Sequence, residues 1–204
     1  MGIFSDFILL LQQSQWLTLL MVSILGLCVG SFLNVVIYRT PLMMEQQWKN
    51  ECQLLLHPEA VADPHEPITL SRPASRCPHC GHSIRWSENM PVISWLLLKG
   101  KCSQCHNAIS YRYPLVEIIT AILSVLLVMK FGVTWQALAG LALTWTLVAL
   151  TGIDFDTQLL PDRFTLPLAG LGLFVNTFGL FVSPTAAIFG YGFGFLCLWI
   201  VYQL

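Results

Sequence analysis

Long apolar runs alternate with short polar breaks along most of the chain. Each of the longer runs carries few or no charged residues, and a helix of about 20 such residues crosses the hydrocarbon core of a bilayer. The pattern therefore predicts five transmembrane helices, within the following ranges: Trp16–Ile37, Leu115–Met129, Val133–Ile153, Phe164–Phe181 and Pro184–Leu204.

One long polar region, from Tyr38 to Tyr113, interrupts this pattern. Its first part, 43–57, mixes Met, Trp and Leu with charged residues, which predicts an amphipathic helix lying along the membrane surface. Four prolines between 58 and 73 indicate an irregular linker. The apolar stretch 92–98 has seven residues and is too short to span a bilayer. It is expected to pack on the rest of the polar region or to dip into the membrane interface.

Composition supports a membrane protein with several spans. Hydrophobic residues make up 55% of the 204 residues and charged residues only 10%, against about 25% charged in a soluble domain. Eight of the ten Lys and Arg residues lie between Arg39 and Arg112. Because membrane proteins keep positive loops in the cytoplasm, we expect the polar region and the loop 154–163 in the cytoplasm and the N-terminus outside it. The net charge of −1 argues neither for nor against nucleic acid, and no nucleic-acid partner is expected.

The polar region contains two CxxC pairs separated by 21 residues, Cys77-Pro78-His79-Cys80 and Cys102-Ser103-Gln104-Cys105. Two such pairs are typical of one zinc ion held by four thiolates. The reducing cytoplasm argues against disulfides as the alternative. Four sulfur ligands leave no position open for water, so the ion is expected to be structural and not catalytic. His79, His82 and His106 lie beside the thiolates and are the alternative ligands.

These observations divide the chain into three parts. Residues 1–37 contain the first transmembrane helix, residues 38–113 form a small cytoplasmic zinc-binding domain, and residues 114–204 contain transmembrane helices two to five. The expected fold class is therefore an all-α polytopic membrane protein of about five transmembrane helices. The zinc-binding domain is an insert between the first helix and the second.

Asp154 closes the apolar run 133–153, so its carboxylate is expected at the boundary between membrane and cytoplasm. An ionisable side chain at such a position suggests a function, although a polar helix end has the same appearance. Asp156 is expected to be solvated. Asp162 follows Pro161 and is expected at the N-cap or in the first turn of the next helix. Residue type and position therefore favour Asp154 as the candidate catalytic residue.

Other polar or small residues within the apolar runs are expected to serve helix packing. Gly30 and Ser31 allow two helices to approach closely, and Asn34 needs a hydrogen-bond partner on another helix. Glu117 is expected to pair with Arg112 or with a polar group on another helix. The Gly-rich stretch 190–194 lies in an apolar run and is interpreted as a helix-packing surface, not as a nucleotide-binding loop.

Taken together, these motifs resemble those of the bacterial type IV prepilin peptidases. These enzymes of pilus and type II secretion systems are bifunctional and act both as leader peptidases and as N-methyltransferases. The resemblance covers essentially all of the 204 residues. Besides the two CxxC pairs, it rests on these segments: Gly30-Ser31-Phe32-Leu33-Asn34-Val35-Val36, Trp86-Ser87-Glu88-Asn89-Met90-Pro91, Tyr111-Arg112-Tyr113-Pro114-Leu115-Val116-Glu117 and Ile153-Asp154-Phe155-Asp156-Thr157-Gln158-Leu159-Leu160-Pro161-Asp162.

The resemblance implies an intramembrane aspartyl protease with two catalytic aspartates at the cytoplasmic ends of helices. Asp154 matches the first of them, and the second belongs to a GxGD motif that this sequence does not contain. Two are needed because one carboxylate activates water while its protonated partner polarises the scissile carbonyl. The chain is therefore expected to be the N-terminal part of a longer enzyme and to lack peptidase activity by itself.

The resemblance also implies substrates, a cofactor and a location. The partners would be membrane lipid and the signal peptides of prepilins and pseudopilins, which would be cleaved at the cytoplasmic face of the bacterial inner membrane. The new N-terminus would then be methylated from S-adenosylmethionine. The alternative is a non-catalytic zinc-binding membrane scaffold that binds signal peptides or the secretion machinery. A third possibility is methyl transfer without proteolysis.

Overall fold

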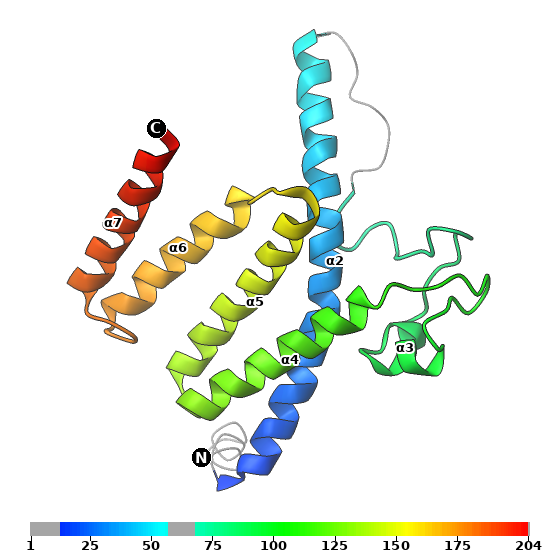
Figure 1. The fold of residues 1–204 in the computed structure, drawn as a ribbon, viewed down its shortest axis with the longest axis horizontal. Helices are drawn as coiled ribbons and strands as arrows, with labels where there is room; N and C mark the ends of the chain where they lie inside the picture. Colours follow the sequence, from blue (N-terminus) through cyan, green and yellow to red (C-terminus); the bar gives the residue numbers. More distant parts are fainter. Residues whose placement is uncertain (1–12, 57–67, 204) are drawn as a thin grey trace.

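The computed structural model describes residues 13–56 and 68–203 of the chain. Within these ranges it contains helices and loops but no β-strand, and two isolated β-bridges lie in the polar region. The all-α class expected from the sequence is confirmed. The elements, labelled in Figure 1, are α2 (Gln15–Leu56), the 3₁₀ helix η1 (Trp86–Asn89), α3 (Ile93–Leu97), α4 (Arg112–Phe131), α5 (Trp135–Thr157), α6 (Asp162–Thr177) and α7 (Pro184–Gln203).

Four helices of the described ranges are long and apolar enough to cross a membrane: α2, α4, α5 and α7. The remaining predicted span, 164–181, corresponds to α6, which has only 16 residues and a length of about 24 Å. The side-chain oxygen of Asn176 accepts hydrogen bonds from the backbone N–H groups of Phe181 (3.1 Å) and Val182 (3.0 Å). These bonds turn the chain toward α7, so the helix ends before the apolar run does.

Helix α2 has 42 residues and continues without a break through the polar residues after its apolar part. Residues 43–56 of the amphipathic segment predicted for 43–57 are therefore helical and continue α2, and His57 lies outside the described residues. Residues 42–56 are mostly Leu, Met, Gln, Glu and Lys, which favour a helix, and Lys49 pairs with Glu45 one turn earlier at 2.7 Å. At 1.5 Å per residue α2 is about 63 Å long. Figure 1 shows its C-terminal part extending beyond the other helices.

Helices α2, α4 and α5 form the packed core, and small residues let α2 and α4 approach each other. A Cβ atom on Gly30 would lie only 2.6 Å from the Cα atom of Glu117, and Gly26 makes the same kind of contact one turn earlier. The backbones of the two helices are therefore in direct contact. Asn34 donates a hydrogen bond to the carbonyl oxygen of Tyr113 at the start of α4 (3.0 Å). The packing roles predicted for Gly30 and Asn34 are confirmed.

Helices α6 and α7 lie beside this core and contain no buried residue. Figure 1 shows them running antiparallel to each other, on the side of α5 that faces away from α2. At Gly190, Gly192 and Gly194 a Cβ atom would meet nothing within 4 Å. The helix packing predicted for this Gly-rich stretch is therefore not formed with any described part of the chain.

Candidate functional site

The two CxxC pairs lie in residues 68–111, which we call the cysteine module, and they fold into two matching turns. In each turn the N–H of the first cysteine donates to the carbonyl oxygen five residues later: Cys77 to His82 and Cys102 to Asn107, both at 2.9 Å. An antiparallel β-bridge closes each turn just outside this bond. The two bridges are Arg76–Ser83 and Lys101–Ala108.

The four thiol sulfurs of these turns form one cluster. They all lie within 4.8 Å of one another, and contacts between the two turns join Cys77 to Cys105 at 3.8 Å and Cys80 to Cys102 at 4.0 Å. A zinc ion bonded to four sulfurs at about 2.3 Å would hold them about 3.8 Å apart. The donor set and its spacing therefore fit one tetrahedral metal ion.

The three histidines considered as alternative ligands do not join this cluster, because the only metal-capable group among the described residues consists of cysteines. His82 instead has its Nε2 atom 3.2 Å from Oε2 of Glu88. His106 occupies, with a φ of 56°, the left-handed position that Gly81 takes in the first turn with a φ of 71°. His82 and His106 therefore each have a structural role outside the sulfur cluster.

Backbone N–H groups surround the thiols and favour their charged form. Those of Cys80 and His79 lower the pKa of the Cys77 thiol to about 7, and N–H groups of its own turn lower the pKa of Cys102. At Cys80 the N–H of His82 acts in the same direction, but desolvation and the neighbouring thiols outweigh it and raise the pKa to about 11. The thiols of Cys77 and Cys80 thus do not ionise together unaided, and a bound cation would supply the charge that allows it.

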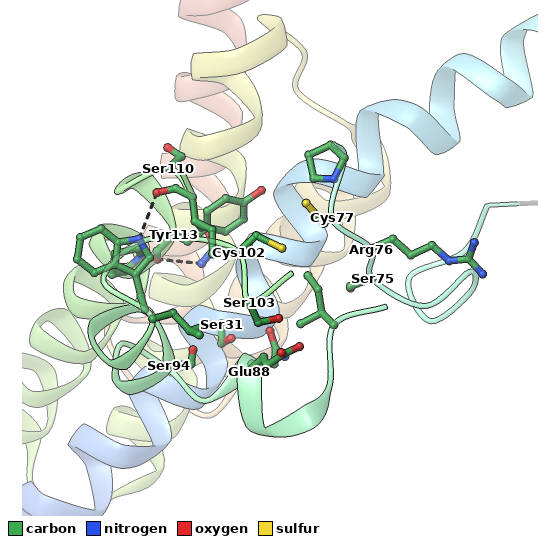
Figure 2. Close-up of a pocket in the computed structure, with 18 of the residues that line it drawn as sticks. Ser31, Ser75, Arg76, Cys77, Glu88, Ser94, Cys102, Ser103, Ser110 and Tyr113 are labelled. Carbon is green, nitrogen blue, oxygen red and sulfur yellow. Dashed lines mark hydrogen bonds between the residues drawn. The ribbon is translucent and has the colours of Figure 1, made fainter. Parts of the chain in front are cut away.

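Glu88 links the two turns through its carboxylate (Figure 2). Its Oε2 atom accepts a hydrogen bond from the N–H of Arg85 at 2.9 Å and contacts His82 in the first turn. Ser103 in the second turn is a further hydrogen-bond partner. These bonds, of which that from Ser103 has the largest effect, hold the pKa of Glu88 down at about 2. The carboxylate therefore stays ionised and holds residues of both turns together.

Arg39 fixes the cysteine module to α2. Its side chain is buried, and its guanidinium group donates hydrogen bonds to the carbonyl oxygens of Thr69 (2.8 Å) and Pro73 (2.7 Å). Two turns further along α2, the side-chain oxygen of Gln46 accepts a bond from the N–H of Ile68 (3.0 Å). The first residues of the module are therefore attached to the part of α2 that follows the apolar run.

Glu117 fixes the other side of the module to the helices. It is 7% exposed, and its Oε2 atom accepts a hydrogen bond from the N–H of Val92 at 2.7 Å. Ser31 on α2 is a second hydrogen-bond partner. The pairing with Arg112, one of the two arrangements expected, is not formed, because a separation of five residues places the two side chains on different faces of α4. Glu117 instead joins three segments that are distant in the sequence.

A cavity of about 600 Å³ lies between the cysteine module and the helices α2 and α4. Its wall includes Ser31 and Asn34 from α2, Glu117 from α4, and Glu88 and Trp95 from the module; Figure 2 shows side chains from all three parts turned into one space. Its volume is in the range of small-molecule sites. The cavity leaves no signal in the sequence, because its wall is assembled from segments that share no motif.

The aspartates near the end of α5 have different surroundings. Asp156 is exposed, as expected, and it also pairs with Arg112, whose Nη1 atom lies 2.6 Å and 2.7 Å from its two carboxylate oxygens. Asp162 lies in the first turn of α6, as predicted. Asp154 is exposed and its side chain has no hydrogen bond or ion pair within the described residues. Arg112 thus neutralises Asp156, while the carboxylate of Asp154 stays accessible; its catalytic role remains a prediction.

Comparison with known proteins assigns this chain to a family. Residues 24–131 match the bacterial peptidase A24 N-terminal domain, and residues 141–204 match the type IV leader peptidase family. Similar curated proteins are named prepilin leader peptidase/N-methyltransferase. That of Stutzerimonas stutzeri is 53% identical over 182 residues, with 89% of this chain and 62% of the relative covered. That of Pseudomonas aeruginosa is 54% identical over 183 residues, with the same coverage of 89% and 62%.

The relative from Pseudomonas putida is 48% identical over 196 residues, with 96% of this chain and 67% of the relative covered. No solved structure matches the chain. The chain spans 62% of the length of the first two relatives. Its apolar helices and this kinship indicate a membrane protein. The two family models match successive parts of the chain, and the relatives are about half identical to it. The chain therefore belongs to the type IV leader peptidase family.

Proposed function

We propose that this chain is part of a prepilin leader peptidase/N-methyltransferase, which removes the leader peptide of type IV prepilins and pseudopilins and methylates the new N-terminus. Its family supports the reaction class. The observation that carries the choice of residue is the contrast at the end of α5: both aspartates are exposed, but Asp156 is paired with Arg112, whereas the side chain of Asp154 has no ion pair or hydrogen bond among the described residues. Asp154 is therefore the proposed catalytic aspartate of this chain.

The proposed chemistry needs two carboxylates. One, ionised, takes a proton from the attacking water, and the other, protonated, polarises the scissile carbonyl of the leader peptide. Asp154 supplies one of them. The second would come from a GxGD motif, which the 204 residues do not contain. We therefore expect the 204 residues alone to leave a prepilin uncleaved.

In this proposal the cysteine module lies in the cytoplasm and the N-terminus in the periplasm, with the helices in the bacterial inner membrane. The support is the concentration of eight of the ten Lys and Arg residues between Arg39 and Arg112. Leader peptides would then meet the module and the exposed end of α5 on one side of the membrane.

The cysteine cluster would hold a structural zinc ion, with Cys77, Cys80, Cys102 and Cys105 as ligands. Such an ion would fix the two turns to each other in a segment that buries few apolar side chains. S-adenosylmethionine is proposed as the methyl donor because the relatives are named N-methyltransferases. No described residue is assigned to the methyl donor.

The test is cleavage of a prepilin by a protein that joins these residues to the C-terminal region of a full-length relative. Asp154→Asn is the test variant and Asp162→Asn is the matched control, because both aspartates are exposed near the same loop. Loss of cleavage in Asp154→Asn, with cleavage retained in Asp162→Asn, supports the proposal. An Asp154→Asn variant that cleaves as fast as its parent contradicts the role of Asp154.

A further inference from the structure

Helix α3 presents an uncovered apolar face. Ile93, Leu96 and Leu97 have the i, i+3, i+4 spacing that places side chains on one side of a helix, and they are 50%, 61% and 78% exposed. Trp95 points the other way, because its Nε1 atom donates to the carbonyl oxygen of Ile109 (3.2 Å) and its ring packs against Gly100. The inner side of α3 thus holds the cysteine module together, and the outer side contacts nothing in the described chain that covers it.

Glu117 determines where α3 lies along the length of helices α2 and α4. It accepts a hydrogen bond from Val92, which immediately precedes α3, and it lies five residues inside α4, about 7.5 Å from the start of that helix. The backbone of Gly30 contacts Glu117 from α2. Gly30 lies seven residues before the end of the apolar run at Ile37, a distance of about 10 Å. Helix α3 therefore begins beside apolar parts of α2 and α4 and not beyond their ends.

Basic residues and a tryptophan flank α3 in the sequence. Lys99 and Lys101 follow α3 within four residues, and Arg85 and Trp86 stand at the start of η1; all four side chains are exposed. An apolar helix face with an adjacent Trp and flanking Lys and Arg is the composition of segments that lie in the boundary between headgroups and acyl chains. Their cations are attracted to anionic headgroups. A helix as short as α3 would not hold this position alone, but the Glu117 contact holds it there.

We propose that the outer face of α3 is immersed in the headgroup–acyl boundary of the leaflet on the side of the cysteine module, with Lys99 and Lys101 at anionic headgroups. The module then rests on the bilayer along α3 and is not a freely standing domain. Glu117 is a positioning residue in this arrangement. The proposal does not depend on the peptidase activity and holds on whichever side of the membrane the module lies.

The test places the photoreactive residue p-benzoylphenylalanine at single positions of the full chain in vesicles of phosphatidylethanolamine and phosphatidylglycerol. Leu97 is the test position. Ile122, exposed on α4, is the lipid-facing control, and Arg72, exposed in the turn held by Arg39, is the water-facing control. After irradiation, mass spectrometry of the intact chain identifies what has been attached. We expect a phospholipid adduct at Leu97 comparable to that at Ile122, and none at Arg72.

Three results would overturn the proposal. The first is an adduct at Ile122 without one at Leu97. The second is a Leu97 adduct with the mass of a second chain, which would make the face a self-association surface. The third is replacement of the lipid adduct by a peptide adduct when an apolar pilin segment is added. The label at Leu96, on the same face, repeats the measurement, and only labelled chains with the far-ultraviolet circular dichroism of the parent are compared.

Discussion

Arg112, the first residue of α4, forms an ion pair of 2.6 Å with Asp156 in the last turn of α5. The same guanidinium group lies 3.4 Å from the carbonyl oxygen of Gly152. Arg112 directly follows the cysteine module, and Asp156 lies two residues after Asp154. This pair therefore joins the segment that directly follows the module to the end of α5 that carries Asp154.

Replacement of Arg112 by Gln is expected to loosen the end of α5 more than it destabilises the whole chain. The two side chains are 38% and 30% exposed, so water screens the pair and its contribution to the free energy of unfolding is only about 0.2–1 kcal/mol. Hydrogen exchange of the residues around Asp156, measured by mass spectrometry in detergent, should become faster. The double variant Arg112→Asp with Asp156→Arg should restore slow exchange. Unchanged exchange in Arg112→Gln would show that the pair does not fix this end of α5.

Gly30→Ala should destabilise the contact between α2 and α4. The new Cβ atom would lie 2.6 Å from the backbone Cα atom of Glu117, so the helices must separate, and overpacking of this kind costs about 1–3 kcal/mol. Gly190→Ala is the matched control, because Gly190 also lies in an apolar helix but a Cβ atom there would meet no described part of the chain within 4 Å. Thermal unfolding of the purified 204-residue chain in detergent measures both. A Gly30→Ala chain as stable as Gly190→Ala would be incompatible with the direct backbone contact.

The cysteine cluster predicts a defined metal content. The chain is expected to carry one zinc ion, and Cys77→Ser together with Cys102→Ser should remove it, because a zinc site needs its thiolate ligands. Cys28→Ser together with Cys52→Ser is the matched control, since these two cysteines are exposed and outside the cluster. Elemental analysis of the purified chains provides the measurement. Equal zinc in the two double variants would refute the site.

Glu117→Ala is expected to release the segment around α3. Without the carboxylate, the partly buried N–H of Val92 loses its partner, and a fully buried donor left unsatisfied costs about 1–3 kcal/mol, which is the upper bound here. Glu117→Gln keeps an acceptor oxygen and should behave like the parent. Hydrogen exchange of residues 92–98 should rise in Glu117→Ala and remain slow in Glu117→Gln. Equal exchange in the two variants would mean that the bond at 2.7 Å does not hold α3.

The residues with a periodic or spaced signal were predictable from the sequence. The apolar runs predicted the helical class, and the spacing of the two CxxC pairs predicted a cluster that the structure forms with all sulfurs within 4.8 Å. Gly30 and Asn34 were predictable because a small and a polar residue in an apolar helix have few other uses. Each of these predictions depends on a pattern within one segment or on the chemistry of one residue type.

The contacts between distant segments were not predictable in this way. Asp156 and Asp154 have the same side chain two positions apart, and only the packing of α4 on α5 shows that Arg112 reaches Asp156 alone. The end of α6 depends on bonds from the Asn176 side chain to the loop that follows. The position of α3 depends on Glu117, 25 residues after Val92. No local pattern encodes which partner a polar side chain finds.

The length of α2 has a mechanical consequence. Gly30 is in backbone contact with Glu117 and acts as the fulcrum about which α2 can tilt. Leu56 lies 26 residues beyond this point, a distance of about 39 Å at 1.5 Å per residue. A rotation of about 10° at the fulcrum moves that end by about 7 Å. Bilayers of different thickness are accommodated by different helix tilts. Such a change would therefore reach Arg39 and Gln46 as a displacement, and through them the start of the cysteine module.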